Sequence, residues 1–340
     1  MLHLGDLHYG DIAVDNVQRF KDAMTAVVTS PGAAKLFSSM HVSYMYDDHD
    51  YAGNNGDAQA LSRHAAMTNY KNMVPVLARN STHASENQLI NYHAFSVASV
   101  RFIITDLRSE ANKTNRVVMG PEQLKWFFSE LVQAPRYSVV VWASTRPWIG
   151  KNATAKDYWG AFPEQRAQIA NFIAEHGITN LILIAGDAHM LAADDGTNSD
   201  YSREGLPPAG FPVLQSAPFA NYGSAKGGPF SEGCFATLLV PNYHFSTLRI
   251  HGIGNSDGPC ISYRGYSAHA SDPVLKFDKC GTLGGVDGVT GGGQASKCSI
   301  RLAPAWLIAV GVFLPLLVIA LIAVAGIVCA GCRKSRSSKQ

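Results

Sequence analysis

Three clusters of acidic and imidazole side chains directly follow short apolar runs in this sequence. They read Gly5-Asp6-Leu7-His8-Tyr9, Asp47-Asp48-His49-Asp50 and Gly186-Asp187-Ala188-His189. Carboxylates that lie close together repel one another and are hard to keep ionised without a counter-cation. Their oxygens suit hard cations, and imidazole or phenolate groups extend the choice to transition metals. The three clusters together predict a two-metal site that holds a phosphoryl group and generates a hydroxide nucleophile.

Each cluster also has its own interpretation. Asp6 and Tyr9, three residues apart across a tight turn, would converge on one ion, and the alternative is an ordinary turn aspartate. The run from Asp47 to Asp50 has the alternative of a solvated acidic surface, but it directly follows an apolar strand, which favours metal binding or catalysis. Asp187 and His189, two residues apart in a loop that begins with glycine, suit ligation of two adjacent ions.

Apolar runs rich in β-branched and aromatic residues predict the strands that position these clusters. The predicted strands span residues 1–4, 41–46, 100–105, 138–143 and 181–185. Pro121 and Pro163 each open an amphipathic helical pattern, and less regular helical stretches span 15–40 and 57–77. This alternation predicts a layered α/β domain. Ligands of open α/β sheets bind beyond the carboxyl ends of the strands, where the clusters fall.

The C-terminal part of the chain shows a different pattern. Segments 235–240 and 243–251 alternate like strands and predict a hairpin. The glycine-rich segment 281–302 predicts a flexible stalk. Segment 303–332 carries no charged residue and is long enough to form a transmembrane helix, and the basic tail 333–340 predicts a cytoplasmic C-terminus. The sequence therefore predicts a single-pass protein anchored in a lipid bilayer, with a large extracellular or lumenal domain.

Charge, glycosylation sequons and cysteines agree with an exported domain. The chain of 340 residues has a net charge of +2, and without the four basic residues of the tail, 24 basic and 26 acidic residues remain. No nucleic-acid-binding surface is indicated. Sequons begin at Asn80, Asn112 and Asn152. Four cysteines before the apolar segment suit two disulfides of open pairing: Cys234, Cys260, Cys280 and Cys298. The alternative is a tail-anchored enzyme that faces the cytosol with these cysteines reduced.

In their order along the chain, the motifs resemble the PhoD-type alkaline phosphatases and phosphodiesterases of the calcineurin-like metallophosphoesterase superfamily. The resemblance runs from about Leu2 to His251. It rests on the three clusters above and on Asn54-Asn55, Asp106-Leu107-Arg108-Ser109, Gly120 with Gln123-Leu124-Lys125-Trp126, and Asp157-Tyr158-Trp159 with Pro163 and Arg166. It implies an α/β/β/α metallophosphoesterase sandwich over residues 1–280 and two or more metal ions, iron and calcium among them.

The resemblance also implies roles for single residues. Six residues would ligate the metals: Asp6, Tyr9, Asp48, Asn72, Asp187 and His189. Asp6 would bridge two ions, Tyr9 would bind the first as a phenolate, and Asp187 and His189 would bind one ion each. His49 would stabilise the transition state or protonate the leaving alkoxide. Arg108 would hold the phosphate, or alternatively form an ion pair with Asp106.

The chain departs from the family pattern at its N-terminus. The superfamily begins with a strand and a first ligand motif, in this family a cysteine, and Gly5-Asp6 already corresponds to the second motif. We therefore expect an N-terminally incomplete domain that lacks its first strand and binds the first metal poorly. The predicted function is a membrane-anchored, extracytoplasmic, metal-dependent phosphoesterase that hydrolyses phosphate mono- or diesters with metal-bound hydroxide. The alternative is a catalytically inactive ectodomain that acts as a binding or receptor module.

Overall fold

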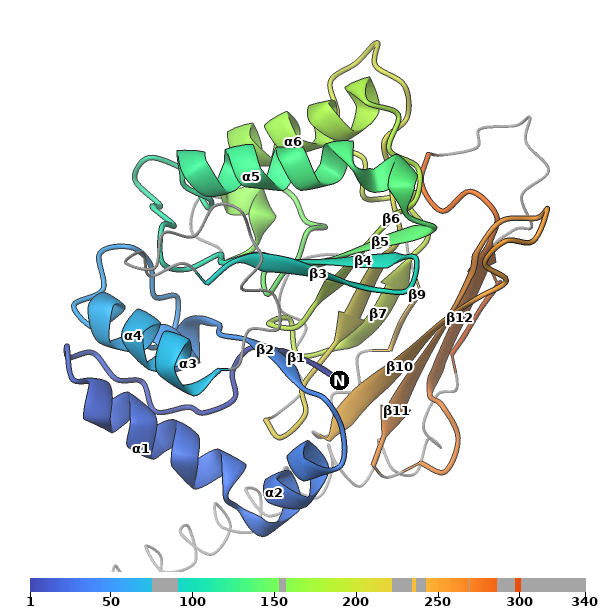
Figure 1. The fold of residues 1–340 in the computed structure, drawn as a ribbon. Helices are drawn as coiled ribbons and strands as arrows, with labels where there is room; N and C mark the ends of the chain where they lie inside the picture. The colour runs from blue at the N-terminus through green and yellow to red at the C-terminus, as the bar shows by residue number, and fades with distance from the viewer. Residues whose placement is uncertain are drawn as a thin grey trace, which may run out of the picture.

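The computed structural model shows two stacked β-sheets, two helices over the outer face of the larger sheet, and a helical region at one end (Figure 1). The structure describes residues 1–74, 91–152, 157–221, 243–268 and 270–285, and the backbone of 234–236 and 297–300. The predicted stalk lies largely, and the predicted transmembrane segment and tail wholly, outside this part of the chain. Among the residues described, no helix combines the length and the apolar character that a bilayer crossing requires.

The larger sheet has seven strands in the order β3-β4-β5-β6-β8-β7-β9. Their bounds are β3 His93–Val97, β4 Val100–Ile104, β5 Val139–Ala143, β6 Leu181–Ala185, β7 Leu191–Asp194, β8 Val213–Ser216 and β9 Cys234–Ala236. Strands β4, β5, β6 and β8 run parallel, and the others pair antiparallel. Every residue of β5 and β6 is buried, because both faces of the sheet are covered. The predicted strands at 100–105, 138–143 and 181–185 are thereby confirmed.

Helices α5 (Pro121–Val132) and α6 (Pro163–Glu175) cover one face of this sheet (Figure 1). Both begin with proline at the first helical position, as the sequence predicts. Their apolar faces pack on a core rich in tryptophan, in which Trp142, Trp148 and Trp159 are fully buried. Short 3-10 helices span Ala134–Arg136 and Trp159–Ala161.

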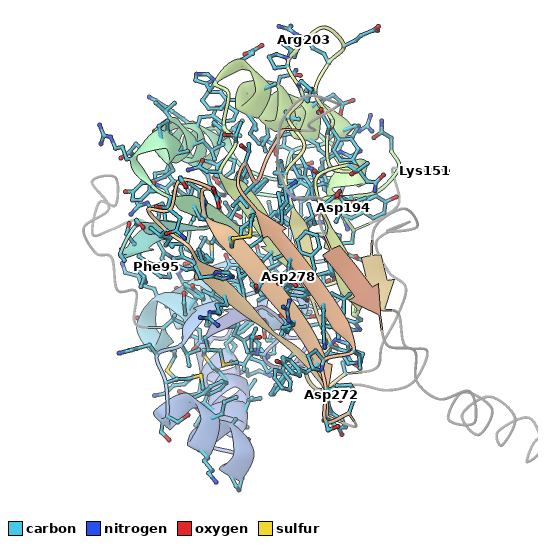
Figure 2. All side chains as sticks on the ribbon, turned by 90° about the vertical axis from the view of Figure 1, so that its right-hand side faces the viewer. Phe95, Lys151, Asp194, Arg203, Asp272 and Asp278 are labelled. Carbon is cyan, nitrogen blue, oxygen red and sulfur yellow. A yellow bond between two sulfur atoms is a disulfide. The ribbon has the colours of Figure 1, made fainter. Side chains whose placement is uncertain are left out.

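The second sheet is antiparallel, in the order β10-β11-β12-β13. Its strands are β10 (His244–His251), β11 (Cys260–Ser267), β12 (Leu275–Cys280) and β13 (Lys297–Ile300). Alternate residues of β11 are buried against the larger sheet. Figure 2 views the outer face, where Asp278 forms an ion pair with Arg264. Among the described residues, no helix covers this outer face, so three of the four layers of the expected α/β/β/α sandwich are visible.

Two predictions for this region have different outcomes. The hairpin of 235–240 with 243–251 is wrong, because β9 pairs with β7 in the larger sheet and β10 pairs with β11. A period-two pattern identifies a strand but does not say which sheet its apolar face joins. Within the described side chains, a disulfide joins Cys260 to Cys280, which lie opposite each other on β11 and β12. The side chains of Cys234 and Cys298 lie outside the described part of the chain.

The N-terminal region supplies two strands and four helices. β1 (Leu2–Leu4) pairs in parallel with β2 (Ser43–Met45), so both strands end on the same side. The helices are α1 (Val17–Val28), α2 (Pro31–Ser38), α3 (Asp48–Tyr51) and α4 (Arg63–Met73). Their core centres on buried aromatic and methionine side chains, among them Phe20, Tyr51 and Tyr70. The region thus brings the first two acidic clusters to the same end as the third, which follows β6.

Candidate metal centre

Three loops meet where β1, β2 and β6 end. Ligand atoms of Asp6, Asp47, Asp48 and Asp187 all lie within 4.8 Å of one another, and so do those of Asp6, Asp48 and His49. Glycine makes this approach possible: a Cβ on Gly5 would lie 2.4 Å from the Cβ of Asp47. A Cβ on Gly186 would likewise lie 2.9 Å from the Leu4 carbonyl oxygen. The three predicted clusters therefore form one site.

Tyr9 joins the first cluster to the third. Its hydroxyl donates to Asp6 Oδ2 at 3.0 Å and lies 3.2 Å from His189 Nε2, although Tyr9 and His189 are 180 positions apart in the sequence. Asp6 and His189 both adopt positive φ angles, 56° and 50°. Such angles are uncommon outside glycine and occur where the chain must turn sharply to aim a side chain. The predicted ligands Asp6, Tyr9 and His189 are thus brought together.

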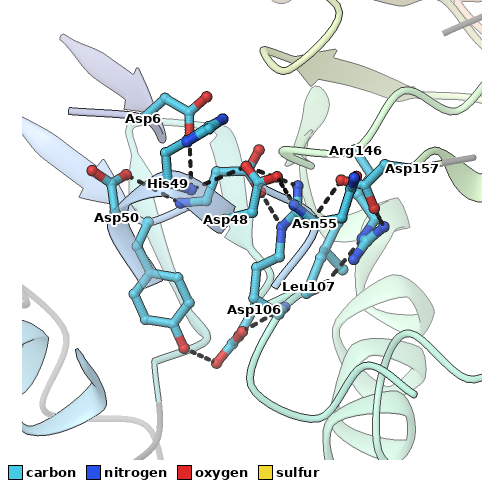
Figure 3. Close-up of polar contacts among 12 residues, drawn as sticks. Asp6, Asp48, His49, Asp50, Asn55, Asp106, Leu107, Arg146 and Asp157 are labelled. Carbon is cyan, nitrogen blue, oxygen red and sulfur yellow. Dashed lines mark hydrogen bonds and ion pairs between the residues drawn. The ribbon is translucent and has the colours of Figure 1, made fainter. Parts of the chain in front are cut away.

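His49 lies directly beside this group (Figure 3). Its backbone N–H donates to Asp48 Oδ1 at 3.1 Å and to Asp6 Oδ1 at 3.4 Å. Its ring Nδ1 lies 2.6 Å from Asp11 Oδ1, and the centroids of the His49 and Tyr9 rings are 4.3 Å apart. Asp11 was not identified as a site residue from the sequence. The one feature that could have pointed to it is that Asp11 is acidic and lies in the same loop as Asp6. The structure gives it a defined place as the partner of the predicted catalytic histidine.

Asp50 and Asn55 hold the second cluster in shape. Asp50 accepts from the backbone N–H groups of His8 at 2.8 Å and of Asp47 at 3.2 Å, so it ties the first loop to the second. The backbone N–H of Asn55 donates to Asp48 Oδ2 at 2.5 Å. These bonds fix the orientation of the carboxylates before any ligand binds.

A group that we call the arginine cluster lies behind the second loop: the buried Arg108, Arg146 and Asp47 and the partly buried Asp157 (Figure 3). The Arg108 guanidinium forms ion pairs with Asp47 and, at 2.7 Å, with Asp157, and its Nη2 lies 3.6 Å from Asp48. Arg146 forms an ion pair with Asp157 as well. Asp106 instead accepts the backbone N–H of Arg108. Because Arg108 is fully buried among carboxylates, the geometry favours an ion-pairing role over phosphate contact, and the pairing partner is not Asp106.

Residues 1–211 match the family model described as PhoD-like phosphatase. The chain belongs to the PhoD-like phosphatase family. Over 175 residues it is 26% identical to alkaline phosphatase D of Bacillus subtilis (strain 168), an alignment that covers 42% of this chain and 30% of that protein. The matched region therefore spans less than a third of that relative.

One solved structure shows the same relation at the level of the fold. A structure of PhoD superposes with a TM-score of 0.52 at 14% identity, over 88% of this chain and 62% of that one. A purple acid phosphatase from yellow lupin (Lupinus luteus) seeds gives a TM-score of 0.39 at 13% identity, over 88% and 46% of the two chains. The first of these likenesses shows that this PhoD-like chain shares the mixed α/β fold of PhoD.

The electrostatics of the PhoD-like site divide it into two parts. Burial, followed by the charges of Asp47 and Asp48, raises the pKa of Asp6 to about 10. Burial and then Asp47 also raise the pKa of Asp187 well above its usual range. Burial acts in the same direction on Asp48 and is the largest single cause, but Arg108, the Asn55 backbone N–H and His49 together hold the pKa of Asp48 below the usual value. Burial and the neighbouring acids therefore disfavour the charged forms of Asp6 and Asp187, and an added cation would favour them.

The donor set fits a metal ion. Asp47 Oδ2 is buried and has no hydrogen-bond partner among the described residues, and it belongs to the group whose ligand atoms converge. Carboxylate oxygens, the Tyr9 phenol and the His189 imidazole suit oxygen-preferring cations and first-row transition metals. We call Asp6, Tyr9, Asp187 and His189 the carboxylate cluster.

Asn72 is the predicted ligand that the structure does not bring to this group. It is exposed on the last turn of α4, and within the described part of the chain no hydrogen bond links it to the carboxylate cluster. Its buried neighbour on the same helix, Asn69, points toward Met24 in the N-terminal core instead. The role of Asn72 as a ligand stays a prediction.

Proposed function

We propose that this chain is a metal-dependent phosphoric ester hydrolase that acts on phosphate mono- or diesters. The observation that carries the proposal is the convergence of four carboxylates within 4.8 Å in a site where burial opposes their ionisation. Such an arrangement is costly for the fold alone and is explained by cations that neutralise it. Membership of the PhoD-like phosphatase family supports the same reaction class.

The carboxylate cluster and Asp48 would ligate the ions. Bound cations would polarise a phosphoryl oxygen and activate water for in-line attack. Asp6 accepts a hydrogen bond from Tyr9, which lies beside His189, and another from the His49 backbone, which also donates to Asp48. These contacts support a role in which Asp6 would ligate both ions. A phenol and an imidazole suit iron, whereas a site of carboxylates suits calcium. We propose this pair of ions, in agreement with the resemblance seen in the sequence.

The chain's own residues would then orient and protonate the substrate. His49 lies next to Asp6 and Asp48, and Asp11 holds its Nδ1, so Nε2 is left to face a bound ester. From there His49 would donate a proton to the leaving alkoxide, a general-acid role. Arg108 would keep Asp48 ionised and in place from behind the site.

The proposal is tested by metal analysis and by hydrolysis of p-nitrophenyl phosphate and bis(p-nitrophenyl) phosphate. His49→Ala should lower kcat by about 10²–10⁴-fold with an unchanged circular dichroism spectrum, the range lost with a general acid. His64→Ala is the matched control, because His64 also faces an aspartate, Asp15, but at the exposed surface. Bound metal without turnover of either ester would instead support the inactive binding module, and full turnover by His49→Ala would disprove its role.

We also propose that the domain faces an extracytoplasmic compartment and is anchored by residues 303–332. The cross-strand disulfide of Cys260 with Cys280 supports an oxidising compartment. The length and apolar character of the segment and its basic tail support the orientation. Protease protection of membrane vesicles that contain the full chain tests this: cleavage of the domain from the cytoplasmic side would contradict it.

A further inference from the structure

Helix α2 has an apolar face that packs on no core. None of its eight residues is buried, and it belongs to none of the described core clusters. Its apolar side chains Ala33, Leu36 and Phe37 instead line a cavity of about 830 Å³. An amphipathic helix ordinarily buries its apolar stripe against the protein interior. The α2 face is therefore available to a ligand that enters this cavity.

The cavity opens directly onto the proposed metal centre. Asp6, Tyr9, Asp187 and His189 line it together with the α2 face, and the segment 217–221 forms another part of its wall. Phe219 in that segment has 52% of its surface exposed. A phosphate held at the carboxylate cluster would thus have its organic group in contact with apolar side chains.

A second cavity, of about 380 Å³, extends the first between α1, α2 and α4. The two share His3, Leu7 and Phe37, so Phe37 stands where they meet. Met24 and Val28 are among the apolar residues that line the second cavity. Both volumes lie in the range of about 300–1,000 Å³ that small-molecule sites occupy.

The charge of the wall limits what the cavity accepts. Neither lysine nor arginine is among the described residues that line either cavity. Apart from the imidazoles of His3, His41 and His189, a second phosphate or another anionic group would meet mainly apolar side chains and the carboxylates among the described lining residues. An uncharged apolar group that moves from water into this cavity gains favourable free energy from the hydrophobic effect.

We propose that this cavity is the subsite for the apolar alkyl group of a phosphate ester whose phosphate is held at the metal centre, and that Phe37 determines specificity for it. The inference rests on the proposed phosphoesterase function and adds the substrate class. The cleaved bond is the ordinary ester P–O bond, with water as the second reactant, so the products are an apolar alcohol and phosphate.

The experiment compares ethyl, butyl and octyl phosphate with the metal-loaded enzyme. Because each buried methylene group is worth roughly fourfold in binding, kcat/KM should rise by at least about tenfold from ethyl to octyl phosphate. Phe37→Gln should reduce the octyl-to-ethyl ratio by about tenfold. Lys35→Gln, on the exposed side of the same helix, is the matched control and should keep the wild-type ratio.

A binding measurement separates this inference from the proposed function. Metal-loaded His49→Ala should bind octylphosphonate at least about tenfold more tightly than ethylphosphonate, and Phe37→Gln should remove the difference. Turnover of all three esters at equal kcat/KM would overturn the subsite while leaving the proposed function standing. Absence of turnover with a preserved octyl preference in binding would overturn the proposed function alone. A dimer that Phe37→Gln dissociates would show that a second copy covers the α2 face, and would overturn the subsite.

Discussion

The arginine cluster and the carboxylate cluster share one end of the fold but carry charge in opposite ways. In the arginine cluster, burial opposes the ionisation of Asp157, yet Arg108 and Arg146 hold the pKa of Asp157 well below its usual range. In the carboxylate cluster, burial and neighbouring acids raise the pKa of Asp6 to about 10. Asp157 is neutralised by arginines of the chain itself, whereas Asp6 awaits a cation. Asp47 lies between these cases, because burial raises its pKa to about 6 although Arg108 lowers it. A buried carboxylate is therefore weaker evidence for a metal where an arginine of the chain pairs with it than where no such partner is present.

Asp48 lies at the boundary between the two clusters. Its Oδ1 is 3.6 Å from Arg108 Nη2 and 3.1 Å from the His49 backbone nitrogen. It belongs to both groups of potential ligand atoms. Arg108 can thus keep one metal ligand ionised before metal binds. The fold thus stabilises one half of the site and leaves the other half to be stabilised by a bound cation.

The largest effect is expected where the fold itself supplies the cation. Arg108→Met would leave Asp47 with a buried charge that has lost its ion-pair partner, whereas Asp157 would keep Arg146. The substitution should lower the free energy of unfolding by about 3–5 kcal/mol. Urea denaturation measures this. Arg116→Met, which breaks an exposed ion pair with Glu164, is the control and should cost less than about 1 kcal/mol. Equal losses in the two variants would show that the arginine cluster contributes no more than a surface pair.

Gly5 lies where the loop of Asp6 approaches Asp47, so its substitution tests whether the site requires this close approach. Gly5→Ala adds a Cβ that would meet Asp47 and places alanine at a φ of +94°, a strain of about 1–3 kcal/mol. The free energy of unfolding, measured by chemical denaturation, and the metal content of the protein should both fall. Gly177→Ala, also at positive φ but with no atom within 4 Å of the added Cβ, separates strain from the clash. Unchanged metal content in Gly5→Ala would contradict the close approach.

Asp6 should give the metal-free protein an unusual pH dependence. Its pKa rises from an ordinary value of 3.8 to about 10 on folding, so between these values the folded state binds the extra proton. Its contribution to stability is complete below pH 3.8 and is lost as pH rises, by at most about 1.4 kcal/mol per pH unit. Chelator-treated protein should therefore be less stable at pH 8 than at pH 5.

Asp6→Asn should flatten this slope in thermal unfolding of the metal-free protein, and added metal should no longer raise the Tm. Asp22→Asn, at an exposed position on α1, is the control. A slope that Asp6→Asn leaves unaltered would mean that Asp6 is ionised in the metal-free fold, and would remove the contrast between the two clusters.

The smallest effect concerns Asp11, which touches His49 at the rim and belongs to neither cluster. Asp11→Asn should lower kcat by roughly tenfold with little change in KM, because the histidine loses the partner that orients it. Metal content should stay at the wild-type level. Asp15→Asn is the matched control, since Asp15 faces His64 in the same way on the surface. Loss of metal in Asp11→Asn would make Asp11 a ligand instead of a positioning residue.

Much of the framework was predictable because it is local. The acidic clusters were recognised from their position after apolar runs, and β1, β2, β4, β5 and β6 confirm those strands. The same reasoning missed β3 and paired β9 with the wrong partner, since a single strand's pattern does not name its neighbour. It also missed Asp11, because the contact with His49 joins residues 38 positions apart.

By itself the sequence determined which residue types stand at the strand ends and which reaction class they suit, since both follow from local composition and order. Only the tertiary structure decided which carboxylates are neutralised by arginine. Arg108 pairs with Asp47, 61 positions away. The loop of Asp6 approaches Asp47 closely because Gly5 has no Cβ, and Gly186 likewise lets the loop of Asp187 approach Leu4. Charge balance depends on distances across the fold, and these distances are set by packing that no local pattern encodes.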